Sequence, residues 1–192
     1  MLGLKHTLAS SLTKMFKGVA DCFFKQRYGH RAVVLETVAG VPGMIAGMFA
    51  HLRSLRHGES TTTPDIHEML SEAENERMHL MMVLAVVQPT VLERFIIAVA
   101  QFVFWHIYLA LYLLSPSTAH LMISMFEEEA VNSYTNYIGL IRQGHLPNPQ
   151  APKIAVDYYG LPSEALWVDV LEKIRLDEQH HCDANRRIAV QL

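Results

Sequence analysis

Residues 31–50 read RAVVLETVAGVPGMIAGMFA, and a single carboxylate, that of Glu36, interrupts a run that is otherwise apolar from Ala32 to Ala50. A buried, ionised carboxylate is costly unless a cation or a metal neutralises it. Glu36 could lie on the exposed edge of a half-buried helix or pair with Arg31. If it instead faces the core, other ligands from distant parts of the chain must converge on it.

The composition limits the class of protein. A length of 192 residues predicts a single domain, residues 1–192, with 51% hydrophobic residues and a formal net charge of −3. This small charge argues against a nucleic-acid partner, which would require a basic face. Two cysteines, Cys22 and Cys182, exclude a disulfide framework and a cysteine zinc site, and favour a reducing compartment.

Apolar residues recur at helical spacing along the whole chain, and no convincing strand pairs appear. The segment Gly58–Pro64, GESTTTP, is the only linker-like stretch before the loop QGHLPNPQAP. The predicted helices are Arg31–Arg56, Pro64–Val87, Val91–Leu114, Pro116–Arg142, a short piece at Ile154–Tyr158, and a last helix from Pro162 or Ser163 to Ile188.

Residues 1–28 predict a basic amphipathic helix. Five cations in this region face one acid, Asp21, and apolar residues lie between them at spacings of three and four. The cations are Lys5, Lys14, Lys17, Lys25 and Arg27. This pattern is typical of a helix on a membrane surface. A transit peptide and a helix docked on the core are the alternatives.

Residues 91–114 predict an interfacial helix. The part from Phe95 to Leu114 contains no Asp, Glu, Lys or Arg and is long enough to cross a bilayer. Its polar and aromatic side chains, such as Gln101 and Trp105, instead suit an interface. A spanning helix would also separate its two flanking helices by roughly 30 Å, which is impossible if those flanks share a site.

Two Glu-x-x-His pairs offer ligands that could meet Glu36. Glu76 and His79 lie in NERMH, and Glu178 and His181 lie in DEQHH. Residues three apart on a helix point the same way, so each pair presents a carboxylate and an imidazole to one metal. One pair is expected by chance in a chain this rich in both residues, but two on separate amphipathic helices are informative. Asn75 and Asp177 precede the pairs and are placed to support the ligands.

The segment FEEEAVNSY supplies the remaining carboxylate. His120, Glu127 and Tyr134 are seven residues apart and therefore share one helix face, which selects Glu127 over Glu128 and Glu129. Four carboxylates and two imidazoles then form the ligand set of four-helix di-iron carboxylate proteins. The set balances two divalent ions and suits iron or manganese. Asp177 and His180, which have the same spacing, are a competing choice for the last pair.

The chain resembles the alternative oxidases, the cyanide-insensitive quinol oxidases of respiratory membranes. The resemblance covers Arg31 to about Asn185 and rests on several motifs. These are LETVAGVPGM, HLRSLR, EAENERMHL, LYLLSPSTAH, EEEAVNSYT, YYGLP and DEQHHCDAN. It implies an all-α, ferritin-like four-helix bundle with a di-iron carboxylate site and added membrane-surface helices.

The resemblance also implies roles for individual residues. The family's six iron ligands fall on the residues selected above: Glu36, Glu76, His79, Glu127, Glu178 and His181. Its redox-active tyrosine falls on Tyr134, and its outer-sphere residues fall on Asn75, His120 and Asp177. Its quinol pocket would be lined by Arg31, Leu35, Phe126, Glu129, Ala130 and Ser133.

The implied activity is a ubiquinol oxidase that holds two iron ions and reduces O2 to water in a four-electron, cyanide-resistant reaction without proton pumping. The expected partners are ubiquinol or a related quinol, O2, and the lipid of one leaflet. The expected location is the matrix face of the mitochondrial inner membrane or a bacterial cytoplasmic membrane. A di-iron quinone-ring hydroxylase is one alternative, and a non-enzymatic iron-binding helical bundle is another.

A homodimer is a further expectation. The spacing Gly43-x-x-x-Gly47 permits close helix approach between two chains. Close packing within one bundle explains the two glycines equally well.

Overall fold

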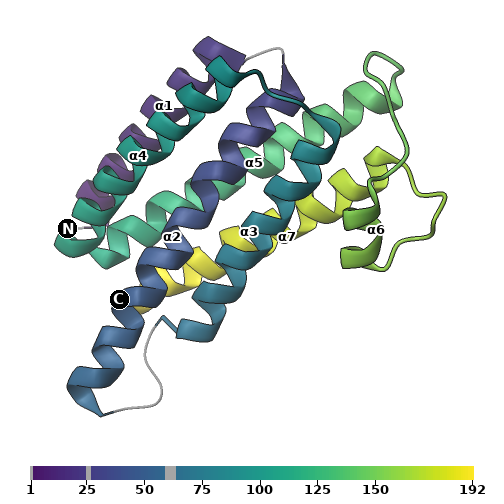
Figure 1. The fold of residues 1–192 in the computed structure, drawn as a ribbon. Coiled ribbons are helices and arrows are strands. Elements are labelled where there is room, and N and C mark those ends of the chain that lie inside the picture. Colours follow the sequence, from purple (N-terminus) through teal and green to yellow (C-terminus); the bar gives the residue numbers. More distant parts are fainter. Residues whose placement is uncertain (1, 25–26, 59–63) are drawn as a thin grey trace.

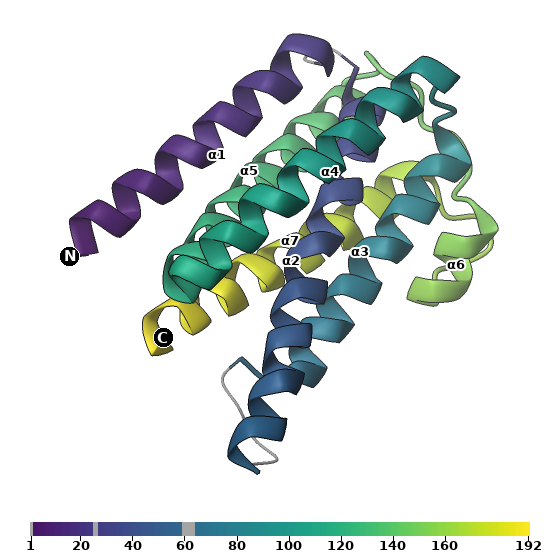
Figure 2. The same ribbon diagram turned by 60° about the vertical axis from the view of Figure 1, so that its left-hand side comes forward.

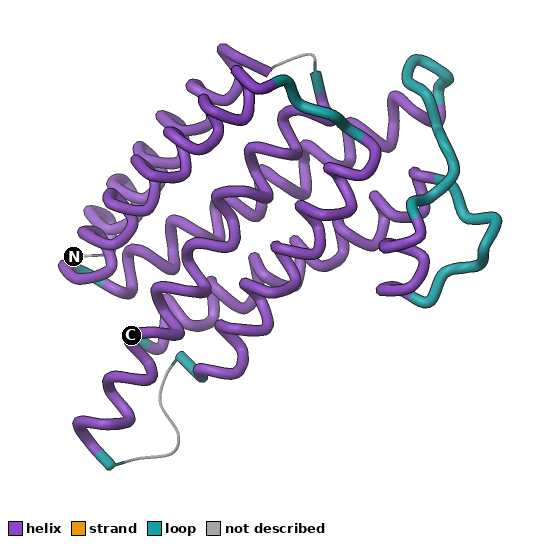
Figure 3. The backbone as a smooth tube through the Cα atoms, in the orientation of Figure 1, coloured by secondary structure: helices purple, strands orange, loops and turns teal. Residues whose placement is uncertain are grey.

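The computed structural model describes residues 2–24, 27–58 and 64–192. Within those ranges the chain is all-α, with a single isolated β-bridge between Gln150 and Leu166 and no longer strand, as the sequence predicts (Figures 1 and 3). The helices are α1 (Leu2–Phe24), α2 (Tyr28–His57), α3 (Ile66–Val86), α4 (Val91–Leu114), α5 (Pro116–Arg142), α6 (Lys153–Tyr159) and α7 (Trp167–Gln191).

Helices α2, α3, α5 and α7 form a four-helix bundle. The most extensive contacts join α2 to α3 and α5 to α7. Two apolar clusters fill the interior, one around Trp167 and Met82 and the other around Tyr108 and Met122. Each bundle helix turns a mainly apolar face inward. The few polar residues on these inward faces therefore meet at the bundle axis.

Glycines on α2 allow it to approach α3 closely. A Cβ atom added at Gly43 would lie 2.5 Å from the carbonyl oxygen of Met69, and one at Gly47 would lie 2.9 Å from Cδ2 of Leu70. No larger residue fits at position 43 without a shift of backbone. In this chain the two glycines therefore serve packing within the bundle, and dimerisation stays a prediction.

Helix α1 packs along α5 in the same direction (Figure 2). The Nζ atom of Lys5 donates to Oγ of Ser117 at 3.1 Å, and Lys17 forms an ion pair with Glu129, so both contacts join residues 112 apart. Ala9 is fully buried in this interface. The helix is docked on the core, one of the alternatives raised by the sequence, and it also keeps exposed apolar side chains at Leu8, Met15, Val19 and Phe23.

Helix α4 lies along the outside of the bundle beside α2 and α5. By length and hydropathy, Tyr28–Arg56 of α2 and the whole of α4 are candidate membrane spans within the described chain. The α2 segment is mostly buried, which suits a core helix, whereas α4 is mostly exposed. Its exposed apolar residues include Val91, Leu92, Phe95, Phe102, Trp105, Leu113 and Leu114.

The observed helix bounds match the predicted ones closely except at the last helix. Helix α7 begins at Trp167, four or five residues later than predicted, because residues 162–166 form a turn and a short extended piece. The backbone N–H of Ala151 donates to the carbonyl of Ala165, and that of Trp167 donates to Pro149. Residues 59–63 of the predicted linker and the cation Lys25 lie outside the described residues.

Candidate metal centre

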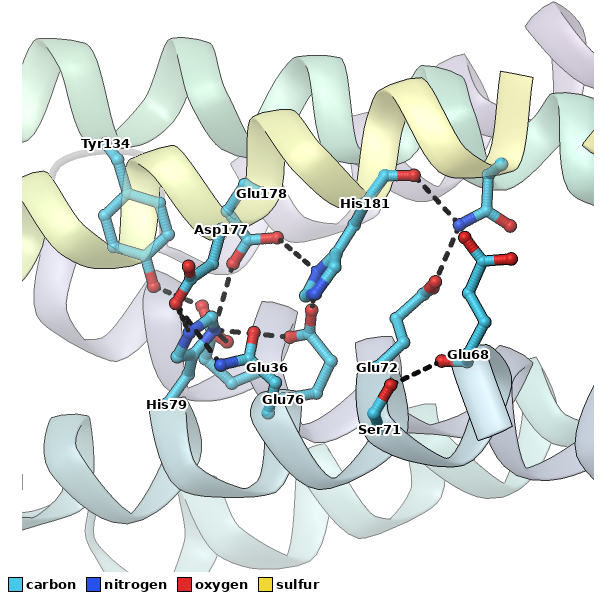
Figure 4. Close-up of polar contacts among 12 residues, drawn as sticks. Glu36, Glu68, Ser71, Glu72, Glu76, His79, Tyr134, Asp177, Glu178 and His181 are labelled. Carbon is cyan, nitrogen blue, oxygen red and sulfur yellow. Dashed lines mark hydrogen bonds and ion pairs between the residues drawn. The ribbon is translucent and has the colours of Figure 1, made fainter. Parts of the chain in front are cut away.

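Carboxylates and histidines from three helices meet at the centre of the bundle (Figure 4). Four buried residues each contribute one ligand atom, and these four atoms all lie within 4.8 Å of one another. The group consists of Glu36 on α2, Glu76 and His79 on α3, and Glu178 on α7. Glu36 therefore faces the core and is only 3% exposed.

Both histidines turn Nδ1 toward the carboxylates. Nδ1 of His79 lies 3.3 Å from Oε2 of Glu36 and 3.3 Å from Oε1 of Glu178. Nδ1 of His181 lies 2.6 Å from Oε1 of Glu76 and 3.7 Å from Oε2 of Glu178. These contacts add His181 to the group. Its neighbour His180, part of the competing pair, is exposed.

Glu127 on α5 is buried and borders a small cavity of about 20 Å³ together with Glu36 and Glu178. Glu128, next to it, is exposed and pairs with Arg186. The helix therefore turns one member of the glutamate triplet toward the centre and another toward solvent. The six residues selected from the sequence are in this way brought to one place.

The electrostatics of the group favour a bound cation. Burial, and then the charge of Glu178, raise the pKa of Glu36 and Glu127 well above the ordinary range of a glutamate. Burial alone would lower the pKa of His79, yet its hydrogen bonds with Asp177 and Glu178 raise it well above the ordinary value. Metal-free protein must therefore take up protons here, and metal binding is expected to release them.

The donor atoms fit a hard to borderline divalent ion. Several buried atoms form no hydrogen bond of regular geometry with the described residues: Glu36 Oε2, both carboxylate oxygens of Glu76, His79 Nδ1, Glu178 Oε2 and His181 Nδ1. Buried polar atoms normally have partners, so these oxygen and nitrogen donors are available as ligands. Carboxylate oxygen with imidazole nitrogen suits iron or manganese.

Asp177 supports His79 from the outside of the cluster. Its Oδ2 atom lies 3.2 Å from Nε2 of His79 and accepts from the hydroxyl of Tyr159 at 2.8 Å and from Nδ2 of Asn75 at 3.2 Å. A carboxylate behind a ligating histidine fixes the ring orientation and tautomer. Asn75 also donates to the hydroxyl of Tyr158 at 2.9 Å.

His120 belongs to a second group of polar contacts, which reaches the cluster through Asn185 and His181. Its Nδ1 atom is 2.7 Å from Oδ1 of Asn185, and Nδ2 of Asn185 donates to Oε1 of Glu72 at 2.9 Å and to the carbonyl of His181 at 3.0 Å. Sequence reasoning missed Glu72, Asn185 and Tyr159. Glu72 is four residues before Glu76, and Asn185 is four after His181, so one-turn spacing from the ligands was the available signal.

Tyr134 on α5 is buried, and its hydroxyl donates to Oε1 of Glu36. Burial and the neighbouring charge of Glu36 raise the pKa of this hydroxyl well above its ordinary value, so the phenol keeps its proton. The side chain therefore joins the cluster through Glu36 (Figure 4).

An apolar cavity of about 350 Å³ lies between α1, α2, α4 and α5, beside the metal centre. It is lined mainly by hydrocarbon, and four residues expected around a quinol border it: Arg31, Leu35, Phe126 and Glu129. Leu35 and Phe126 also border the small cavity at Glu36, so the two cavities adjoin. Ala130 borders only the small cavity, and the half-buried Ser133 borders neither.

Helix α1 engages the two charged residues that α2 and α5 contribute to the apolar cavity, and its own Lys17 also borders the cavity. Arg31 pairs with Asp21, and Glu129 pairs with Lys17. The two α1 residues are four apart, which places them on one face of the helix. The cavity therefore has charge pairs on its α1 side and hydrocarbon over the rest of its wall.

Comparison with known proteins assigns the family. The model of the family described as alternative oxidase matches residues 3–190. This chain belongs to the alternative oxidase family. A ubiquinol oxidase of Batrachochytrium dendrobatidis, named as mitochondrial, is 46% identical over 184 residues, which are 94% of this chain and 57% of that protein.

Two further relatives are similar to the same extent. A ubiquinol oxidase of Trachipleistophora hominis is 45% identical over 183 residues, covering 95% of this chain and 57% of that protein. Ubiquinol oxidase 2, mitochondrial, of Glycine max is 47% identical over 178 residues, covering 93% and 53%. The chain thus spans a little over half the length of these relatives.

Proposed function

We propose that this protein is a ubiquinol oxidase that couples the oxidation of two quinols to the four-electron reduction of O2 to water. The observation that carries the proposal is the apolar cavity, which adjoins a buried carboxylate and histidine cluster through Leu35 and Phe126. A lipid-soluble reductant must bind in an apolar cavity close to the metal pair in order to pass electrons to it. Family membership and the names of the relatives point to the same activity.

We infer that two iron ions are held by the six ligands Glu36, Glu76, His79, Glu127, Glu178 and His181. When bound, such a pair supplies the electrons and the open coordination positions for O2 chemistry. The chain's own residues orient it: Asp177 holds His79 through Nε2, and Tyr134 holds Glu36 through its hydroxyl. Because Tyr134 keeps its proton, it is placed to supply both a proton and an electron beside Glu36.

Arg31 and Glu129 are the proposed head-group contacts for the quinol, with Leu35, Phe126, Ala130 and Ser133 near it. Binding would exchange the ion pairs with Asp21 and Lys17 for hydrogen bonds to the quinol oxygens. The isoprenoid tail would lie along the apolar residues of α1 and α4, which line the cavity. Quinol oxidation releases protons, and a carboxylate at the head group can accept one.

The same arrangement supports the proposal that the protein attaches to one leaflet of a membrane. Exposed apolar side chains of α1 and α4 lie on the helices that wall the cavity, so lipid would be continuous with its lining. The inner mitochondrial membrane is the proposed site, since two of the relatives are named mitochondrial. A homodimer remains part of the proposal, with exposed Met44, Met48 and Leu70 on α2 and α3 as a candidate contact.

The test is oxygen uptake by iron-loaded protein with a short-chain ubiquinol, in the presence and absence of cyanide. The proposal predicts cyanide-resistant uptake of one O2 for each two quinols oxidised, with no hydroxylated quinone formed. A hydroxylated product would favour the quinone-ring hydroxylase. Iron loading far beyond two ions per chain, without turnover, would favour an iron-binding bundle.

A further inference from the structure

A second set of buried polar residues lies between the metal cluster and one end of the bundle. Glu72, His120 and Asn185 are joined by the hydrogen bonds already described, and Tyr108 and Tyr112 on α4 lie beyond them. The ring centroids of Tyr112 and His120 are 5.7 Å apart, and those of Tyr108 and Tyr112 are 6.1 Å apart. All five side chains are buried.

This set leads from the cluster toward solvent. Its inner end is Asn185, which donates to the carbonyl of His181, and Glu72, one turn before Glu76. Its outer end is the half-exposed Arg53 on α2. Burial raises the pKa of Tyr112, and the charge of Arg53 partly offsets this. Burial lowers the pKa of His120, and the charge of Arg53 acts in the same direction. Each residue lies within two turns of one end of its helix.

Oη of Tyr108 and Nε2 of His120 belong to this set and have no hydrogen-bond partner among the described residues. Tyr108 is 0% exposed and His120 is 1% exposed. A buried hydroxyl or imidazole without a hydrogen bond is destabilising, and ordered water is the usual partner. Since both atoms belong to one contiguous polar group, a bound water can satisfy more than one of its members.

We propose that Glu72, Asn185, His120, Tyr112 and Tyr108 bind ordered water and form the route by which water and protons exchange between the metal cluster and solvent beside Arg53. The role given to this route rests on the proposed function. Water is the expected product, and the cavity on the other side of the cluster is apolar and would be filled by quinol. A separate polar exit is therefore needed.

The character of Glu72 is consistent with this route. Burial raises the pKa of Glu72 to about 7, partly offset by the charge of His181 and the hydrogen bond from Asn185. A carboxyl group with a pKa near neutrality can exist in both protonation states, which favours proton transfer through a chain of hydrogen bonds. The geometry of the chain, however, is what defines the route.

The first test is a crystal structure of the full-length wild-type protein at atomic resolution. The proposal predicts ordered water within hydrogen-bonding distance of Oη of Tyr108 and of Nε2 of His120. The Tyr108→Phe variant should lose the water bound to the hydroxyl. A wild-type structure in which both atoms are enclosed by side chains without water would overturn the proposal.

The second test measures oxygen uptake of wild type and variants in mixtures of H2O and D2O. Tyr108→Phe should lower kcat severalfold and increase the solvent isotope effect, without changing the KM for quinol. Tyr112→Phe serves if Tyr108→Phe does not fold. The matched control is Tyr137→Phe, which removes a buried hydroxyl that accepts from Nε1 of Trp167 at 3.3 Å, away from the route.

The outcomes separate the two proposals. Unchanged kcat and isotope effect in both route variants would overturn the route even if the water is present. A wild-type protein that binds iron but does not oxidise quinol would instead overturn the proposed function, and the crystallographic water would still decide whether these residues bind it.

Discussion

The four-helix bundle and the layer formed by α1 and α4 distribute their side chains in opposite ways. The bundle buries carboxylates at its centre, whereas the layer exposes large apolar residues such as Phe95 and Phe102, each about two-thirds exposed. A soluble protein of this size normally does the reverse in both places. The inversion supports the proposals made above, that the bundle binds cations and that the layer contacts lipid.

The largest expected effect comes from removing a central carboxylate. Glu178→Leu should abolish binding of the metal pair and reduce quinol oxidation to background, because Glu178 contacts both histidines. The metal-free variant should be more stable than metal-free wild type, since the repulsion that Glu178 exerts on the buried carboxylates of Glu36 and Glu127 is removed. Metal analysis and urea unfolding measure the two effects.

The matched control for this experiment is Glu172→Leu on the same helix, where the carboxylate is partly exposed and pairs with Arg142. It should retain both the metal and the activity. Destabilisation of the metal-free Glu178→Leu protein would show that the bundle does not depend on cations in the way proposed.

The second effect concerns the exposed layer. The double variant Phe95→Glu, Phe102→Glu should weaken binding to phospholipid vesicles by about two to four orders of magnitude, because each ring contributes roughly 1.5–3 kcal/mol when buried in lipid. Co-sedimentation measures the loss. Val190→Glu, at an exposed position on α7, is the control and should bind vesicles like wild type. Equal loss of binding in both variants would show that the layer of α1 and α4 is not the lipid-binding surface.

A third, smaller effect tests how the bundle holds its ligands. Asp177→Asn should lower metal affinity about ten- to a hundredfold, because the amide cannot hold Nε2 of His79 as the carboxylate does. Competition with a chelator measures the affinity. Asp183→Asn on the exposed side of α7, where Asp183 accepts from Gln179, should leave it unchanged.

The smallest effect lies at the start of α4, where the layer has a charged cluster of its own. The backbone N–H and hydroxyl of Thr90 donate to Glu93, and Arg27 pairs with it, so the pKa of Glu93 falls from 4.5 to about 2. A lowered folded-state pKa contributes stability above the unfolded value, and this contribution is lost as the pH falls toward about 2. Glu93→Gln should therefore lose part of the pH dependence seen in wild type.

Thr90→Ala at the same site should cost about 1 kcal/mol through loss of the cap. Thermal unfolding between about pH 5 and pH 2 compares the variants with wild type. An identical pH dependence in wild type and Glu93→Gln would show that this cluster does not stabilise the attachment of α4.

Much of this arrangement could be predicted from the sequence, because helices encode their inward faces locally. Three- and seven-residue spacings identified Glu76 with His79 and Glu127 with Tyr134 before any fold was known. The bounds of α4 and α5 followed from Pro89, Ser115 and Pro116, whose effects on helix ends are local.

Other features depend on contacts that spacing does not encode. The start of α7 is set by backbone hydrogen bonds to residues 149–151, which no local pattern predicts. The pairing of Arg31 with Asp21 and of Glu129 with Lys17 depends on how α1 docks. Glu72 and Asn185 were visible as one-turn neighbours of ligands, but only the packing of α3 against α7 shows that they bond to each other.

Gly43, which has no side chain beyond a hydrogen atom, bears on the geometry of the metal centre. It lets the backbone of α2 come close to that of α3 at Met69, and Glu36 and Glu76 each lie two turns from that contact on their helices. A methyl group there would widen the gap between opposing oxygens, and wider cages admit large ions with high coordination numbers, such as calcium. Gly43, which is not itself a candidate ligand, is therefore expected to influence which metal the cluster accepts.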